Sequence, residues 1–230
     1  MNGVSRGIGD GIFRRLAADG WDVAEAATSE EKESAIAAEL SEVHGVASKA
    51  VGIVVEVYLS VVEGFAEVEA YLGPLGLVVI YSGVSGVASI LEMDPADFGE
   101  LIDIIVKGVF HVSKAGLGSM VARGTKGSII QIGSIAGVNG FPHRVGYCGS
   151  KAAVHMMTKV LGAEMAEYGI RVNAVAPGYI GTDLIQELMD DGRLDPEPVL
   201  ARIPMGEMGA PADIAAAVAW LASADSRYVT

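Results

Sequence analysis

Short apolar runs alternate along this chain with longer amphipathic stretches, and this alternation restricts the possible folds more than any other feature. Apolar runs of about 4–8 residues between turn residues are typical of buried strands, whereas longer stretches with helical spacing of apolar residues are typical of helices. The alternation predicts βαβ units, and therefore an α/β fold with one doubly wound parallel sheet and helices on both faces. The expected strands are 23–27, 50–57, 75–81, 128–133 and 170–176, and the expected helices lie near 7–19, 30–43, 61–71, 95–122, 147–168 and 211–223.

The two ends of the sequence fit a complete sheet of this kind poorly. A Gly-rich turn begins at Gly3 with no apolar run before it, and residues 228–230 look like the approach to a further strand. Because the first strand of a doubly wound sheet is central, we expect the first and last strands to be missing from this sequence. Glu25 is a further irregularity, because a carboxylate in a buried strand costs several kcal/mol unless it is paired. We see no repeat or linker, so we expect a single domain over 1–230.

The composition excludes several classes of protein. Lys and Arg number 16 and Asp and Glu number 29, which gives a net charge of −13, whereas a nucleic-acid-binding surface needs a basic stripe. Polar residues interrupt every stretch of about 18 residues, the length of a transmembrane helix, and Arg6 and Asp10 interrupt any signal peptide. The one cysteine, Cys148, excludes an internal disulfide and fits a reducing compartment. We therefore expect a cytoplasmic protein with no nucleic-acid or membrane partner.

Two short motifs have chemical meaning. Gly3, Gly7 and Gly9 open the first expected helix, where glycine lets the backbone approach a pyrophosphate whose charge the helix N-terminus attracts. Tyr147 and Lys151 are four residues apart and therefore share one face of a helix. A phenol is a weak acid at neutral pH, and a nearby ammonium group favours its phenolate form. Taken alone, each motif also has an ordinary explanation, as a Gly-rich turn and as a pair on a helix surface.

Two further segments follow expected strands, at the edge where open parallel sheets bind ligands. Ser134 follows the fourth expected strand, and its hydroxyl is placed to hold a carbonyl oxygen while Tyr147 delivers a proton. Residues 177–182 (Pro-Gly-Tyr-Ile-Gly-Thr) follow the fifth. A turn serine and a Pro-Gly turn are the ordinary explanations. Residues 182–205 contain three prolines, interrupt the alternation and indicate an excursion with short helices.

Together these residues resemble the classical short-chain dehydrogenase/reductase family in type, order and spacing, over nearly the whole chain. The resemblance implies a Rossmann-type domain that transfers a hydride between nicotinamide and a carbonyl or secondary alcohol carbon. It also implies that Tyr147 is the general acid/base, that Lys151 assists it and binds the nicotinamide ribose, and that Ser134 positions the substrate oxygen. The residues that carry the resemblance are Gly3, Gly7, Gly9, 109–110, Ser134, Tyr147, Lys151, 171–173, 177–182 and 209–215.

The family pattern further implies a lid, an assembly and a set of cofactor contacts. Residues 182–205 would be the substrate lid, and the long helices near 95–122 and 147–168 would join chains into a homotetramer or homodimer. The implied cofactor contacts are Gly3, Ser5, Arg6, Gly7, Ile8, Gly9, Thr28, Glu56, Gly83, Tyr147, Lys151, Pro177, Gly178, Ile180 and Thr182.

The choice between NADP and NAD depends on the end of the strand 23–27. An acidic residue there would bind the ribose 2′-hydroxyl and repel a 2′-phosphate, but Ala27 and Thr28 are uncharged. Arg6 in the Gly-rich turn can pair with a 2′-phosphate. We therefore expect NADP in preference to NAD, with a small carbonyl or alcohol as the substrate.

The chain departs from the family pattern at four places. Asn2 stands where Thr is usual, residues 80–83 replace Asn-Asn-Ala-Gly, Glu56 replaces an adenine-contacting Asp, and Ile105 replaces the active-site Asn. Two hypotheses stay open. One is an active enzyme near the β-ketoacyl carrier-protein reductases and sugar-alcohol dehydrogenases, and the other is a nucleotide-binding regulator or scaffold with weak or no turnover. Retention of all three expected catalytic residues favours the enzyme.

The histidines and the cysteine carry less information. His44, His111, His143 and His155 lack the spacing of a metal site, so we expect no metal. We expect His111 and His155 to be surface or interface residues on helices, and Cys148 to be a small packed side chain beside Tyr147.

Overall fold

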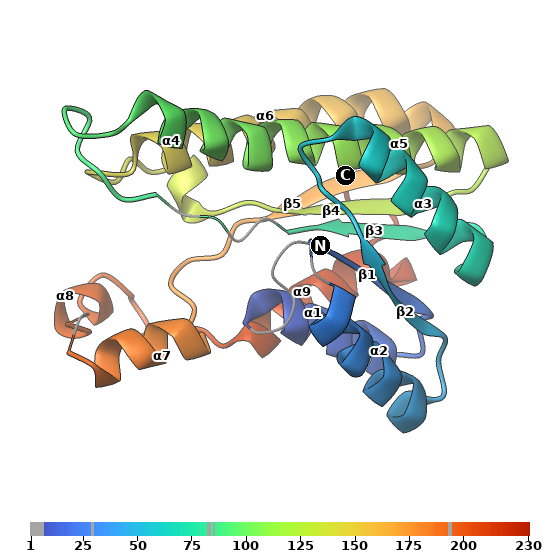
Figure 1. The fold of residues 1–230 in the computed structure, drawn as a ribbon, viewed down its shortest axis with the longest axis horizontal. Coiled ribbons are helices and arrows are strands. Elements are labelled where there is room, and N and C mark those ends of the chain that lie inside the picture. The colour runs from blue at the N-terminus through green and yellow to red at the C-terminus, as the bar shows by residue number, and fades with distance from the viewer. Residues whose placement is uncertain (1–6, 29, 82–83, 85, 193–194) are drawn as a thin grey trace.

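The computed structural model describes residues 7–28, 30–81, 84, 86–192 and 195–230, and its helices and strands alternate along the chain (Figure 1). The α/β fold with parallel strands between helices is confirmed. The strands are β1 (Val23–Ala27), β2 (Ser48–Gly52), β3 (Leu77–Ile80), β4 (Ser128–Ile132) and β5 (Arg171–Val175). The α-helices are α1 (Ile8–Ala18), α2 (Glu30–His44), α3 (Tyr58–Leu72), α4 (Pro95–Leu101), α5 (Gly108–Arg123), α6 (Val145–Met165), α7 (Asp183–Asp190), α8 (Glu197–Leu200) and α9 (Pro211–Ala222).

The strands form two parallel sheets, which corrects the expectation of one continuous sheet. β1 pairs with β2, and β4 lies between β3 and β5. No strand among the described residues pairs with both β1 and β3. A cavity of about 580 Å³ separates them instead, and its walls include Ala24 of β1, Val78 of β3, Leu16 of α1 and Phe65 of α3.

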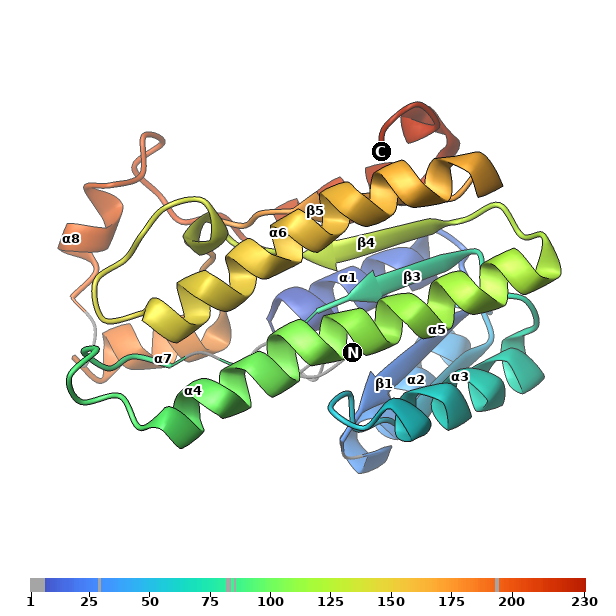
Figure 2. The same ribbon diagram turned by 90° about the horizontal axis from the view of Figure 1, so that it is seen from above.

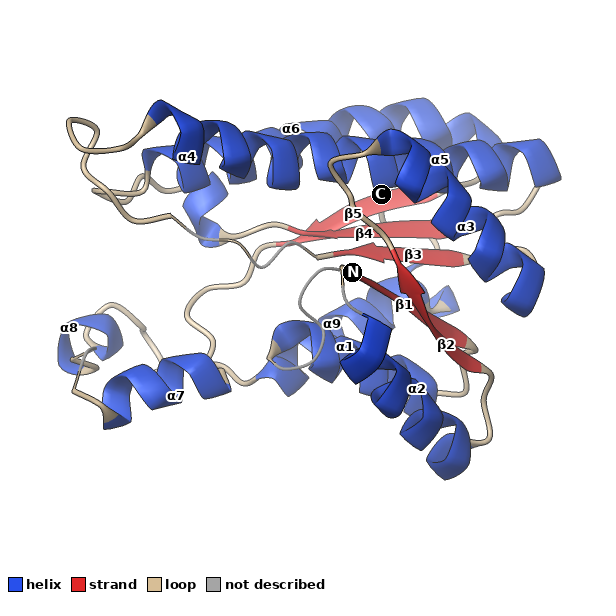
Figure 3. Cartoon of the chain, viewed as in Figure 1, coloured by secondary structure: helices blue, strands red, loops and turns tan. Residues whose placement is uncertain are grey.

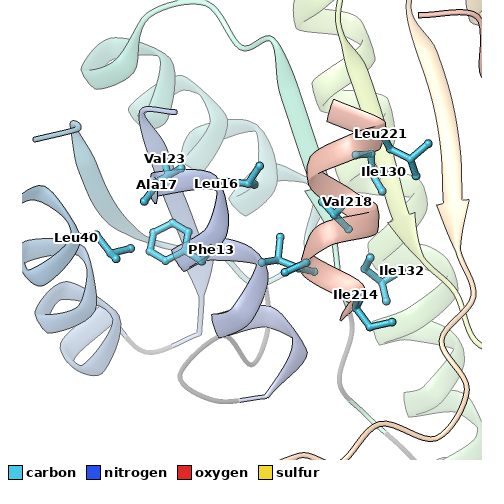
Figure 4. Packing of buried hydrophobic residues seen from close by; sticks show 12 residues of the cluster. Phe13, Leu16, Ala17, Val23, Leu40, Ile130, Ile132, Ile214, Val218 and Leu221 are labelled. Atoms are coloured by element: carbon cyan, nitrogen blue, oxygen red, sulfur yellow. The ribbon is translucent and has the colours of Figure 1, made fainter. Parts of the chain in front are cut away.

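Helices cover both faces of the sheets and hold the two parts together. In Figures 1 and 3, α4, α5 and α6 lie above β3–β5, whereas α1, α2 and α9 lie below the strands. Figure 2 shows α5 and α6 running side by side over β3 and β4. In Figure 4, Phe13 and Leu16 of α1 belong to the same buried cluster as Ile130 of β4 and Val218 of α9. The two sheets are therefore joined through helix packing.

Element boundaries differ from the prediction mainly at β2. This strand was expected over 50–57 but spans Ser48–Gly52, because the apolar residues after it enter a turn. The N–H of Val54 donates to Oγ of Ser60 at 3.0 Å, and the N–H of Val57 donates to the carbonyl of Val54 at 3.0 Å. Hydrogen bonds within the turn thus replace the ladder that the apolar run suggested.

The expected long helix at 95–122 contains a change of helix type. A π-helical segment, Ile102–Lys107, joins α4 to α5. By length and composition alone, the continuous helical segment Pro95–Arg123 could cross a membrane. Leu101, Ile105 and Met120 of this segment nevertheless pack in a buried cluster with residues of β3, β4 and α6, as in the core helix of a globular fold.

Candidate active site

A buried polar network fixes β4 between α5 and α6. Gln131 has no exposed surface, and its side-chain amide donates to Oγ of Ser113 at 3.0 Å. Thr158 of α6 donates its hydroxyl proton to Oε1 of Gln131 at 2.7 Å. Satisfied buried hydrogen bonds favour one arrangement of the packed elements. The carboxyl end of β4 is therefore held at a fixed position against α6.

Ser134 lies just beyond that carboxyl end, at the start of a short 3₁₀ turn, Ile135–Gly137. The hydroxyl oxygen of Ser134 accepts the N–H of Ala136 at 3.1 Å, which leaves the hydroxyl proton free to be donated to a ligand. The N–H of Gly133 donates to the carbonyl of Val175 at 2.8 Å, and that of Ile135 donates to the carbonyl of Pro177 at 3.0 Å. The Ser134 loop is thus tied to the segment that follows β5.

Tyr147 and Lys151 lie one turn apart in the N-terminal part of α6, on the same helical face as the sequence predicted. Nζ of Lys151 donates to the carbonyl of Ile132 at 2.9 Å and lies 5.8 Å from the centre of the Tyr147 ring. Only 2% of Lys151 is exposed, and this burial lowers its pKa to about 8. At neutral pH the side chain is still a cation, beside a phenol that is partly buried.

His155 is a residue of this site that the sequence analysis missed. Its Nε2 is the acceptor for the N–H of Ser134 at 3.4 Å, and its ring abuts the backbone of Gly133 and Gly137. The sequence analysis expected a surface or interface position; His155 is partly exposed, and its ring also contacts the Ser134 loop. The available signal was spacing, since His155 follows Lys151 by four residues, as Lys151 follows Tyr147.

Gly7, at the start of α1, lies at the same edge of the structure, beside Thr182. Gly7 caps the helix at φ 74°, a conformation that favours glycine, and a side chain there would contact Thr182 at 3.3 Å. The first N–H groups of α1 have no partner within the helix and suit an anion. Ile180 pairs with Gly209 in an isolated parallel bridge. Ile8 is half-buried in the core cluster of α1, and Gly9 is buried.

The other expected cofactor contacts are placed only in part. Gly3, Ser5, Arg6 and Gly83 lie outside the described residues. Thr28 is exposed directly after β1, and Pro177 is buried whereas Gly178 is exposed after β5. Glu56 lies in the turn after β2, where its Oε2 is buried with no hydrogen-bond partner among the described residues. No described group of three His, Cys, Asp or Glu side chains could hold a metal ion.

Two departures from the family pattern are visible at the site. Ile105 has no exposed surface and packs with Val109 and Val154, so it cannot hold a water molecule through its side chain. Tyr81 follows β3, and burial, with a smaller contribution from Tyr147, raises its pKa. A second phenol therefore lies near Tyr147, where the family has a small amide-containing segment.

These features fit a dinucleotide, because Gly7, the N-terminus of α1 and the carboxyl ends of β4 and β5 lie at one edge. Comparison with known proteins agrees. The family model described as "Enoyl-(Acyl carrier protein) reductase" matches residues 3–230. The 3-oxoacyl-(acyl-carrier-protein) reductase FabG of Haemophilus influenzae is 35% identical over 232 residues, covering 100% of this chain and 92% of that protein.

Solved structures extend the comparison. A short-chain type dehydrogenase/reductase from Mycobacterium marinum superimposes with a TM-score of 0.90 at 34% identity, covering 100% of this chain and 89% of the other. A gluconate 5-dehydrogenase from Burkholderia cenocepacia, in complex with NADP and tartrate, gives a TM-score of 0.91 at 33% identity with the same coverage. The chain belongs to the short-chain dehydrogenase/reductase family. It is an NAD(P)-dependent oxidoreductase with a Rossmann-type fold.

Proposed function

We propose that Tyr147 is the proton donor of a carbonyl reduction in which Ser134 and Lys151 assist it. One observation carries this proposal: the Tyr147 phenol and the buried Lys151 cation share a face of α6 beside the Ser134 loop. A bound nicotinamide would supply the hydride to the carbonyl carbon. Ser134 donates a hydrogen bond to the carbonyl oxygen, and the phenol transfers its proton to that oxygen. The cation of Lys151 stabilises the phenolate that is left, which regains a proton from solvent.

We propose NADPH as the preferred cofactor of this reaction. Ala27 and Thr28 put no carboxylate at the end of β1, the position where one would repel a 2′-phosphate. Arg6, outside the described residues, is the cation that the sequence offers to that phosphate. The Burkholderia cenocepacia relative was solved with NADP.

We propose a 3-oxoacyl thioester as the substrate, with the reverse oxidation of a secondary alcohol as the same chemistry. The support is the 35% identity to a 3-oxoacyl-(acyl-carrier-protein) reductase along the whole chain. Residues 182–205 would cover the substrate as a lid. They form α7 and α8, which project beyond the carboxyl ends of β3–β5 (Figures 1 and 3).

The proposal is tested with Tyr147→Phe, assayed by NADPH absorbance with acetoacetyl-CoA, other ketones and polyols. We expect kcat to fall about 10²–10⁴-fold, because the proton donor is lost. NADPH affinity, measured by fluorescence, should change little. Tyr168→Phe removes a phenol that is 46% exposed after the far end of α6 and should leave kcat unchanged. Full activity of Tyr147→Phe would refute the assigned role.

A second function, a nucleotide-binding regulator or scaffold, is favoured by one observation. Ile105 is packed in the core where the family has its active-site Asn. The same panel separates the two functions. Binding of NADPH by the unmodified protein, without its oxidation by any ketone, would support the scaffold.

We also propose a homodimer or homotetramer in the cytoplasm, joined through the long helices α5 and α6. Apolar side chains are exposed on both helices, including Phe110 at 52%, Met156 at 58% and Val160 at 47%. Burial of such surface favours association of chains. The single cysteine, Cys148, suits a reducing compartment. The acidic charge of −13 gives no reason to expect a nucleic-acid partner.

A further inference from the structure

We propose that His155 is a positioning residue, which holds the backbone of Ser134 so that the serine hydroxyl faces the substrate. The inference rests on the proposed function of Ser134. His155 acts through Ser134 and does not itself contact the substrate or the transferred proton. Three features of the structure support this role: a hydrogen bond, the close packing of the ring, and the charges around it.

The hydrogen bond joins α6 directly to the loop that carries Ser134. Nε2 of His155 accepts the Ser134 N–H at 3.4 Å, a long bond whose geometry the surrounding packing fixes. On the other side of the same loop, Nζ of Lys151 donates to the carbonyl of Ile132. The loop is therefore held from α6 at two successive helical turns, one before and one at Ser134.

The packing leaves the ring little freedom to move. A side chain at Gly133 would collide with Nε2, and one at Gly137 would come within 2.8 Å of Cε1. Both positions are glycine, so the imidazole ring lies directly against main chain on both sides of Ser134. A ring held this way fixes the distance between the Ser134 backbone and α6.

The charge state of His155 decides whether the bond exists. Nε2 can accept only in the neutral ring with the proton on Nδ1, because both nitrogens of the cation are donors. Burial, and then the neighbouring Lys151 and Lys159, lower the pKa of His155 below its ordinary value. Residues 133–138 carry no ionisable side chain, and Val172, Asn173 and Ala174 of β5 line the adjoining cavity with His155 and are uncharged. Lys159 of α6 and the terminal residue Thr230 line the same cavity. The charges around the ring thus keep it neutral, and an acceptor, at neutral pH.

The test compares His155→Leu, which removes the acceptor, with His155→Gln, which keeps a side-chain oxygen. With NADPH and acetoacetyl-CoA at pH 7.5, we expect kcat of His155→Leu to fall about three- to tenfold, the loss of one neutral hydrogen bond. The KM for NADPH should not change, and His155→Gln should stay within about twofold of the unmodified protein. His44→Leu makes the same chemical change at an exposed position at the end of α2 and should have no effect.

A pH profile distinguishes positioning from a structural role. In the unmodified protein, kcat should fall at acid pH, below the ordinary pKa of histidine, as the ring becomes protonated. In His155→Gln this acid limb should be absent, because an amide does not titrate. Protein NMR gives a readout that needs no turnover: the Ser134 amide proton should titrate with His155 and exchange faster with solvent in His155→Leu.

Several outcomes would overturn the inference. They are an unchanged Ser134 amide in His155→Leu, an acid limb that persists in His155→Gln, and a loss of kcat that is as large in a Ser134→Ala background. A fully active Ser134→Ala protein would instead refute the proposed role of Ser134, while the amide measurements would still decide whether His155 holds that backbone.

Discussion

The half of the molecule around β3–β5 and the half around β1–β2 differ in whether their buried polar groups have hydrogen-bond partners. In the first half, Gln131, Thr158 and Lys151 are buried and each has a hydrogen-bond partner. In the second half, both carboxylate oxygens of Glu25 are buried without a partner among the described residues, as is one oxygen of Glu33. The exception in the first half is the hydroxyl of Ser128, at the amino end of β4, away from the Ser134 loop.

Buried polar groups therefore have different consequences in the two halves, for the geometry of the site in one and for the free energy of unfolding in the other. Partnered buried groups fix the geometry on which proton transfer depends. Unpartnered buried carboxylates lower the free energy of unfolding and fix nothing. Substitutions in the first half should therefore disturb both stability and catalysis, whereas the right substitution in the second half should improve stability alone.

The largest effect is expected at the centre of the partnered half. Gln131→Leu removes two hydrogen bonds and leaves the hydroxyls of Ser113 and Thr158 to find other partners. The free energy of unfolding should fall by about 2–4 kcal/mol, measured by urea denaturation. Gln186→Leu, on the exposed surface of α7, is the matched control and should change it little. If Gln131→Leu left the free energy of unfolding almost unchanged, the proposed difference between the two halves would be wrong.

In the other half, Glu25→Gln should increase stability. Burial, and then the nearby Glu33, raise the pKa of Glu25 to about 7. In the unfolded chain the carboxyl of Glu25 loses its proton near the ordinary pKa of 4.5, whereas in the folded protein it keeps the proton up to about pH 7. The free energy of unfolding therefore falls as the pH rises from 4.5 to about 7. At pH 8 the variant should gain about 2–3 kcal/mol, and at pH 4 nothing.

The measurement is urea denaturation at both pH values, with Glu42→Gln as the exposed control in α2. Equal gains at pH 4 and pH 8 would show that desolvation of the carboxylate is not the cause.

Lys151 should have a smaller effect on the free energy of unfolding. It tests the comparison because it is a buried charge in the half around β3–β5, where buried polar groups have partners. Its pKa is about 8 in the fold and 10.5 ordinarily, so the unfolded chain binds more protons between these values. Stability should therefore rise with pH, by about 1–2 kcal/mol from pH 8 to pH 9.5. In Lys151→Met this rise should be missing while catalysis is lost. If stability rose equally with pH in the unmodified protein and in Lys151→Met, titratable groups other than Lys151 would be the cause.

Much of the fold could be predicted from the sequence, and the misses have physical causes. β1 was predicted to the residue because its apolar run lies between Asp22 and Thr28. β2 was misplaced because hydrogen bonds in the 53–57 turn outweigh the apolar pattern there. The expected absence of a central strand agrees with the division into two sheets, but the sequence analysis still described one sheet, because local periodicity does not identify strand partners.

The placement of the proposed site could be predicted where residue spacing carries the chemistry. Tyr147 and Lys151 follow helical periodicity, and Ser134 follows a strand, so their placement on one edge could be inferred. His155 could not be identified this way, because its partner is the backbone N–H of Ser134, which has no signature in the sequence.

The cavity of about 580 Å³ between β1 and β3 affects the order in which the two sheets unfold. No ladder of backbone hydrogen bonds crosses it among the described residues, so the two sheets are coupled there by side-chain packing, to which the helices contribute. Amide exchange should then reveal two cooperative units, and the β1–β2 unit, whose buried carboxylates have no hydrogen-bond partner among the described residues, should open first.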